Sequence, residues 1–137
     1  MTDENMKRHN FVKVKGNTYH VKDNTLDLRN LGIIDITEIE GLDKLTTLKV
    51  LILRGNQIEE IKGLEHLINL QELDLRWNQI EEIKGLETLT NLEKLELWGN
   101  PIREDEQHLF KKFESAQDIV GYCQEKARMT NDPDRKA

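Results

Sequence analysis

Leucine and isoleucine recur along the chain at fixed spacings, and the whole pattern repeats every 22 residues. Residues 48–69 (LKVLILRGNQIEEIKGLEHLIN) align without a gap on residues 70–91 (LQELDLRWNQIEEIKGLETLTN), with 16 of 22 positions identical. A third copy begins at Leu92 and stops after Ile102, and an irregular earlier copy, with three extra residues, begins near Leu26. Because repeats of this length cannot bury their apolar side alone, the pattern predicts a solenoid of stacked coils.

Each copy has the form L-x-x-L-x-L-x-x-N-x-I-x-x-I-x-G-L-x-x-L. The L-x-L alternation predicts a short strand that sends both leucines inward and the residues between them outward. Asn56, Asn78 and Asn100 follow three residues after the last strand leucine, where a buried amide can bond to the backbone of neighbouring coils. Gly63 and Gly85 permit a tight bend before a short helical turn. The copies are therefore expected to stack around one continuous apolar core.

With these positions recurring in phase over residues 26–102, the chain resembles the leucine-rich-repeat family. It is similar to the short intracellular class with 22-residue coils, to which phosphatase regulatory subunits and dynein-associated repeat proteins belong. The resemblance implies an α/β fold, a leucine-rich-repeat solenoid with a parallel sheet on its concave side and short helical segments on its convex side. Leu31 departs from the pattern, since it stands where the first copy should carry the asparagine.

The segment before the repeats predicts a β-hairpin that caps the first coil. Apolar residues within 11–14 and 19–21 flank Gly16 and Asn17, which we interpret as the turn. We expect the hairpin to lay a strand beside residues 26–28, because an open solenoid leaves the side of its first coil uncovered.

The segment after the repeats predicts a helical cap. Three bulky residues come first and are expected to form an apolar cluster: Leu109, Phe110 and Phe113. Ser115 and Asp118 fit a capping box that begins a helix. The next apolar residues fall at helical spacing and form one stripe: Ala116, Ile119, Val120, Cys123 and Ala127. We predict that the stripe lies over the last coil, docking of a partner being the alternative.

These segments predict a single domain over residues 1–137. Its predicted parts are a frayed start, a hairpin cap, the repeats, a helical cap and a disordered tail, at residues 1–9, 10–24, 25–102, 103–129 and 130–137 respectively.

Charge and composition exclude several functions. A net charge of −6 disfavours binding to a phosphate backbone, so no nucleic-acid partner is expected. No apolar stretch approaches the length of a membrane span, so no membrane association is expected. The single cysteine, Cys123, cannot form a disulfide within the chain, which favours a cytoplasmic location.

The sequence offers no candidate for chemistry. It contains no glycine-rich phosphate loop, no CxxC and no HExxH, and its four histidines are isolated from one another. Paired glutamates recur with the scaffold on turns, where adjacent side chains diverge. We therefore expect no catalytic residue, no cofactor and no metal, and predict that the chain is not an enzyme.

The differences between the two near-identical copies favour a binding role for the concave face. Three of the six differences fall at outward strand or strand-end positions, as Val50/Glu72, Ile52/Asp74 and Gly55/Trp77. A fourth, Lys49/Gln71, adjoins them, and two lie on the convex side, as His66/Thr88 and Ile68/Thr90. Stacking the copies also brings both tryptophans of the protein onto one face beside three arginines, and Trp and Arg are enriched at interface hot spots.

The predicted protein-binding residues on that face are Arg29, Val50, Ile52, Arg54, Asp74, Arg76, Trp77, Glu96 and Trp98. The alternative is that each arginine only pairs with a neighbouring acid and stacks on a tryptophan, which would stabilise the sheet. Four strands form a narrow platform that suits a peptide, a helix or one domain surface, bound by a monomer. Two other roles stay open: the regulatory subunit of an enzyme, such as a phosphatase or small GTPase, and a self-associating scaffold.

Overall fold

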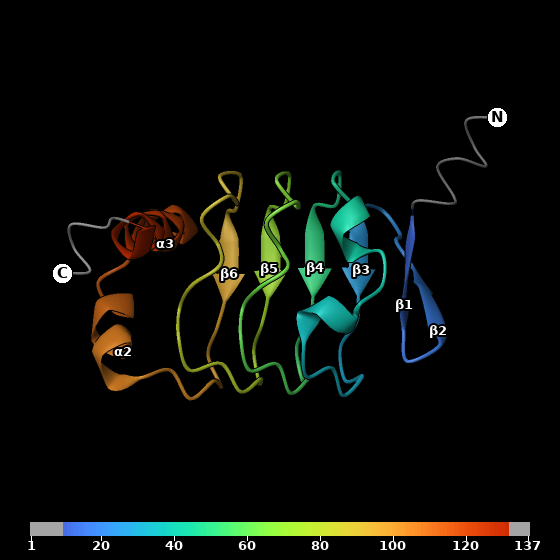
Figure 1. Ribbon diagram of the computed structural model, residues 1–137, viewed down its shortest axis with the longest axis horizontal. Helices are drawn as coiled ribbons and strands as arrows, with labels where there is room; N and C mark the ends of the chain where they lie inside the picture. The colour runs from blue at the N-terminus through green and yellow to red at the C-terminus, as the bar shows by residue number, and fades with distance from the viewer. Residues whose placement is uncertain (1–9, 132–137) are drawn as a thin grey trace.

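The computed structural model describes residues 10–131 of the chain, and its centre is a sheet of four short parallel strands (Figure 1). The strands are β3 (Thr25–Asp27), β4 (Val50–Ile52), β5 (Glu72–Asp74) and β6 (Lys94–Glu96), and they lie side by side in that order. One leucine of each strand shares a register position with the next: Leu26, Leu51, Leu73 and Leu95. The α/β solenoid predicted from the repeat is confirmed.

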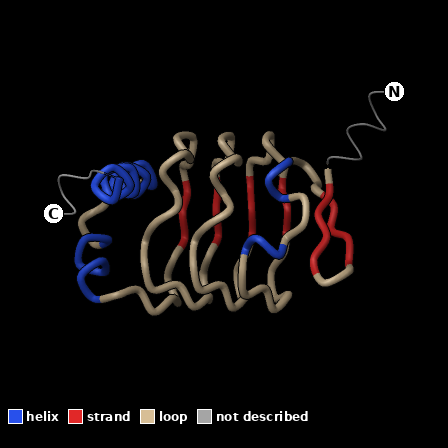
Figure 2. The backbone as a smooth tube through the Cα atoms, viewed as in Figure 1, coloured by secondary structure: helices blue, strands red, loops and turns tan. Residues whose placement is uncertain are grey.

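The coils return from strand to strand through loops rather than long helices (Figure 2). Two 3₁₀ helices, η1 (Ile36–Glu38) and η2 (Leu42–Lys44), lie in the first coil, which holds the three extra residues. The next two coils carry only single turns there, closed by hydrogen bonds such as the one of 3.0 Å from the Leu67 N–H to the Leu64 carbonyl. Helical segments on the convex side are therefore confined to the first coil within residues 25–102.

The leucines and isoleucines of the repeat form one continuous core along the stack. The repeated asparagines supply its polar interior, as predicted. The side chain of Asn78 accepts from the Ile58 N–H at 3.0 Å and donates to the carbonyls of Leu53 and Leu75. Asn56 and Asn100 repeat this arrangement, and each bonds both to its own coil and to the coil before it. The amide groups thus satisfy backbone groups that the turning chain would otherwise bury unpaired.

The N-terminal hairpin consists of β1 (Phe11–Val14) and β2 (Asn17–His20), and it differs from the expectation in two respects. Its turn is Lys15-Gly16, not Gly16-Asn17, because Val14 pairs with Asn17 and both turn residues have positive φ. This is the backbone of a two-residue type I′ turn, in which glycine suits the second position.

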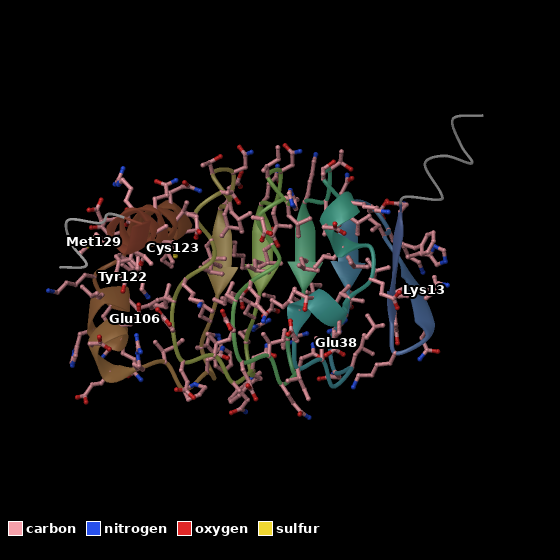
Figure 3. All side chains as sticks on the ribbon, in the orientation of Figure 1. Lys13, Glu38, Glu106, Tyr122, Cys123 and Met129 are labelled. Carbon is pink, nitrogen blue, oxygen red and sulfur yellow. The ribbon has the colours of Figure 1, made fainter. Side chains whose placement is uncertain are left out.

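The hairpin also does not extend the sheet by hydrogen-bonding to residues 26–28, since β1 and β2 form a separate two-stranded sheet. Lys13, labelled in Figure 3, instead exchanges two backbone hydrogen bonds with Glu40 of the first coil, at 3.0 and 2.9 Å. The side chains of Val12 and Val14 are fully buried and cover that coil. The cap is therefore attached at the convex side of the first coil.

The C-terminal cap consists of α2 (Glu104–Phe110) and α3 (Ala116–Asn131). The capping box is present, because the Ser115 and Asp118 side chains each accept from the other residue's N–H. The predicted stripe packs on the core, with Ala127 half-buried and its other four members buried. Leu109, in contrast, is 39% exposed and does not join the cluster of Phe110 and Phe113, whose rings lie 6.4 Å apart. The α2 helix turns Leu109 outward.

Glu106 anchors this cap to the last full coil, although its side chain is charged and buried (Figure 3). Its carboxylate accepts from the Ile83 N–H at 2.8 Å, from the Lys126 ammonium at 2.6 Å and from the Tyr122 hydroxyl. Burial alone would raise the pKa of the Glu106 carboxyl, but these hydrogen bonds outweigh it and hold the pKa below its ordinary value. Lys126 also pairs with Glu82 at 2.8 Å, so the buried charges are compensated.

The predicted frayed start at residues 1–9 lies outside the described residues, as do positions 132–137 of the predicted tail. The boundary at residue 130 is wrong, because α3 continues through Asn131.

Candidate protein-binding face

The two tryptophans of the protein lie against each other at one end of the concave face. The exposed fraction is 54% for Trp77 and 58% for Trp98, among the highest for any large apolar side chain within residues 10–131. Their rings meet edge to face with centroids 4.9 Å apart. The guanidinium of Arg76 lies 5.6 Å from the ring centroid of Trp98, within cation–π range. The cluster thus offers two large, mutually fixed apolar surfaces to solvent.

An unusual backbone conformation places Trp77. The position after the strand-end residue has positive φ in every coil and is occupied by Asn30, Gly55, Trp77 and Gly99. Asparagine and glycine tolerate this left-handed conformation, whereas a residue with a bulky side chain is strained in it. Trp77 nevertheless adopts a φ of 59°.

The next coil provides the seat for the Trp77 ring. A Cβ atom added at Gly99 would lie 2.7 Å from Cε3 of Trp77, which is closer than real contacts allow. The absence of a side chain at Gly99 therefore permits the Trp77 ring to lie over its backbone. The equivalent positions of two neighbouring coils therefore act together: Trp77 presents its ring, and Gly99 leaves the space that the ring occupies.

In three coils the residue directly before this positive-φ position is an arginine, and two of these arginines form hydrogen-bonded pairs with acids. Arg76 donates two side-chain hydrogen bonds to Asp74, at 2.9 and 2.8 Å, and lies 2.8 Å from Glu96 on β6. Arg29 pairs with Asp27 at 2.8 Å in the same i, i+2 arrangement. Burial would raise the pKa of the Asp74 carboxyl, but the hydrogen bonds from Arg76 hold it below its ordinary value. The alternative in which each arginine pairs with a neighbouring acid is thus present, with hydrogen bonds, for these two arginines, and Arg54 joins it through a longer ion pair with Asp74.

Arg54 is the exception among these three arginines. The residue two positions before it is Ile52, so it has no carboxylate within its own strand. Its nearest acid is Asp74, at 3.9 Å from Nη1, which is beyond hydrogen-bonding distance. No hydrogen bond from the Arg54 guanidinium to any residue in 10–131 is present.

The structure brings all nine predicted residues onto the strands or strand ends of one face. Trp77 and Trp98 are the most exposed of these residues, whereas Asp74 and Arg76 are largely buried and paired with each other. The predicted binding residues did not include Glu72 and Lys94, which share a register position with Val50 and line, together with it, a shallow depression on this face. Glu72 was already placed among the outward positions by its alignment with Val50, and the same alternation places Lys94 there.

The described residues offer no evident chemistry. Within residues 10–131 there is no cluster of three or more His, Cys, Asp or Glu side chains that could hold a metal ion. Burial raises the pKa of the Cys123 thiol to about 11, which keeps it protonated and unreactive. No helix in the described part of the chain has the length and apolar content needed to cross a membrane.

Stacked coils, a parallel concave sheet and a ladder of buried asparagines define a solenoid repeat protein. The chain is a leucine-rich-repeat protein. The family model described as leucine-rich repeats (2 copies) matches residues 46–78 and 68–111. Leucine-rich-repeat domains are in general protein-interaction modules and are typically non-catalytic.

Among solved structures, the chain is similar to an internalin from Listeria monocytogenes. The two share 34% sequence identity with a TM-score of 0.53, over 59% of this chain. The match spans only 23% of the length of the internalin chain. No curated protein matches the chain significantly.

Proposed function

We propose that the protein binds a partner protein on its concave face, with Trp77 and Trp98 as the apolar anchor. The remaining contact residues of this proposal are Arg29, Val50, Ile52, Arg54, Asp74, Arg76 and Glu96. The four-strand platform is narrow, about 15 Å across at 4.8 Å per strand interval, and so suits a peptide, a helix or one surface of a domain. We further propose that a monomer acts in this way in the cytoplasm, consistent with a single cysteine buried in the core.

The observation that carries the proposal is the strained and exposed position of Trp77. A tryptophan in a left-handed conformation costs free energy that its edge contact with Trp98 only offsets, so the exposed ring adds no net stability to the fold. The fold itself is served by glycine or asparagine at this position, as the other three coils demonstrate. Strain of this kind tends to persist at sites of function. Contact with a partner would bury the rings of Trp77 and Trp98, and this would explain why position 77 carries a tryptophan.

The test is a variant that restores the residues of the neighbouring coils. Trp77→Gly copies Gly55 and Gly99, and Trp98→Arg copies the arginine column, so the double variant should keep its fold. Ile68→Thr is the matched control, because it removes an exposed apolar side chain from the convex side and copies Thr90 of the next coil.

Immobilised wild type, double variant and control would be exposed to a cytosolic extract, with bound proteins quantified by mass spectrometry and folding verified by circular dichroism. We expect a specific protein to be retained by the wild type and the control but not by the double variant. Equal recovery on all three would refute the assignment of binding to the concave face.

A further inference from the structure

The strand β4 differs from the other three strands of the sheet in every outward position. Its outward residues are Val50 and Ile52, both half-exposed and aliphatic. The equivalent residues in the other strands are polar or charged: Thr25, Asp27, Glu72, Asp74, Lys94 and Glu96. The concave face therefore has one aliphatic stripe in an otherwise polar surface.

Arg54, the arginine without an acid two residues before it, lies two residues beyond the end of the same strand. In the first and third coils an aspartate two residues before the arginine holds the guanidinium by hydrogen bonds, as Asp27 does for Arg29. Arg54 has no such partner, because the residue two positions before it is Ile52. The neighbouring Asp74 carboxylate already accepts two side-chain hydrogen bonds and one backbone hydrogen bond from Arg76. Since a guanidinium has five N–H donors in a fixed fork, Arg54 retains its capacity to bind a carboxylate.

These features meet in one place. A shallow depression of about 200 Å³ is lined by Val50, Ile52 and Arg54 on one side and by Glu72, Asp74 and Arg76 on the other. The Arg54 side chain is about one-third exposed, and its guanidinium donates no hydrogen bond to any residue within 10–131. An aliphatic surface next to a cation with open donors is complementary to an aliphatic side chain next to an anion.

We infer that the partner segment presents an Asp or Glu side chain that binds Arg54, next to an aliphatic side chain that packs on Val50 and Ile52. A single carboxylate fits this surface better than a phosphate, because the depression is lined by three acids (Glu72, Asp74 and Glu96) and three cations (Arg54, Arg76 and Lys94) and so has no surplus of positive charge to neutralise a dianion. This inference rests on the proposed function and adds the chemistry of the bound segment: the tryptophans anchor the partner and Arg54 selects an acid in it.

Ile52→Asp provides a sharp test because it recreates the aspartate–arginine pair of the first and third coils. The introduced carboxylate should occupy the Arg54 guanidinium while the fold is kept, since acids stand at this position in all three other strands. Arg54→Gln removes the cation directly. Arg103→Gln is the control, because it neutralises an exposed arginine outside the concave face.

The probe is a phage library of random 12-residue peptides fused through their C-termini, so that only side chains can supply a carboxylate. Peptides would be selected on the full-length wild type, and one of them made synthetically and its affinity measured for each variant. We expect an Asp or Glu beside a Leu, Ile or Val to be enriched, and the affinity to fall about tenfold or more in Ile52→Asp and Arg54→Gln but not in Arg103→Gln.

The outcomes separate this inference from the proposed function. Peptides that require Trp77 and Trp98 but show no acid preference, or whose affinity is unchanged by Ile52→Asp, would overturn the role of Arg54 and leave the concave face as the binding site. Peptides whose affinity survives the Trp77→Gly/Trp98→Arg variant would contradict the tryptophan anchor. A library that yields no enriched sequence would overturn the inference that a short segment supplies the acid.

Discussion

The left-handed conformation of Trp77 predicts a reversal of the usual ranking of alanine and glycine. At ordinary positions alanine is more stable than glycine by about 0.5–1 kcal/mol, because glycine loses more backbone entropy on folding. At a φ of 59° a residue with a Cβ atom pays about 1–2 kcal/mol that glycine does not pay. Trp77→Gly and Trp77→Ala both delete the ring, so the strain and the entropy decide the difference between them. Glycine should be the more stable by about 0.5–1 kcal/mol.

The wild type should lie close to the glycine variant. The edge-to-face contact with Trp98 contributes about 0.5–1.5 kcal/mol, which offsets strain of similar size. The assay is urea unfolding followed by far-ultraviolet circular dichroism. Gly121→Ala in α3 is the control for the ordinary ranking, because a Cβ at Gly121 meets open space and should stabilise by about 0.5–1 kcal/mol. A Trp77→Ala protein at least as stable as Trp77→Gly would refute the strain argument.

Three further predictions concern the scaffold, each measured by urea unfolding. Asn78→Ala should cost about 2–4 kcal/mol, because it leaves buried backbone groups unpaired, whereas Asn69→Ala removes one exposed hydrogen bond and should cost below about 1 kcal/mol; similar costs would contradict the role of the buried ladder. Gly85→Ala should cost more than Gly63→Ala although both have a φ of 79°, because only at Gly85 would a Cβ meet a backbone oxygen, at 2.2 Å; equal costs would mean that backbone strain alone matters. Glu106→Gln should cost about 2–4 kcal/mol at neutral pH. Because the folded-state pKa of Glu106 is lowered, its contribution is complete well above 4.5 and is lost as the pH falls, so the variant should lose less stability on acidification than the wild type, and parallel curves would refute this.

The repeat unit was predictable because its constraints are local in sequence. Leu51 and Leu73 alternate with outward residues within one strand, and a buried asparagine must satisfy the backbone wherever the chain turns from the sheet. Both rules act within a few residues of the positions concerned. They identify the coils, the register and the concave face without any knowledge of tertiary contacts.

The attachments at the ends were not predictable in the same way, because they depend on contacts between distant segments. The hairpin bonds to Glu40, which lies in a loop without any strand pattern. Its turn uses Lys15 with positive φ, whereas the Gly16-Asn17 pair was the stronger local signal. Glu106 resembles any helix-surface glutamate in sequence, and only its approach to Ile83 and Lys126 makes it a buried anchor.

For the binding face, the repeat alignment placed both tryptophans on one side of the sheet, but it did not reveal the backbone strain at Trp77. The positive φ of Trp77 follows from its position, which is equivalent to Asn30, Gly55 and Gly99 in the other coils. The separate behaviour of Arg54 is not evident from the repeat, since Arg54 and Arg76 occupy equivalent positions; only the distances show that Asp74 accepts hydrogen bonds from Arg76 and lies 3.9 Å from Arg54.

The buried asparagines have a consequence for biosynthesis, because each of their bonds between coils joins a coil to the one before it. Asn56, Asn78 and Asn100 each bond backward to the preceding coil, so a coil has all its backbone groups satisfied only when its successor is present. A chain leaving the ribosome begins with its N-terminal end, and the newest coil must wait for about 22 more residues before its interior is complete. During translation each coil should therefore become stably folded only after the next coil has been synthesised. The cap anchored by Glu106 completes the last of these steps.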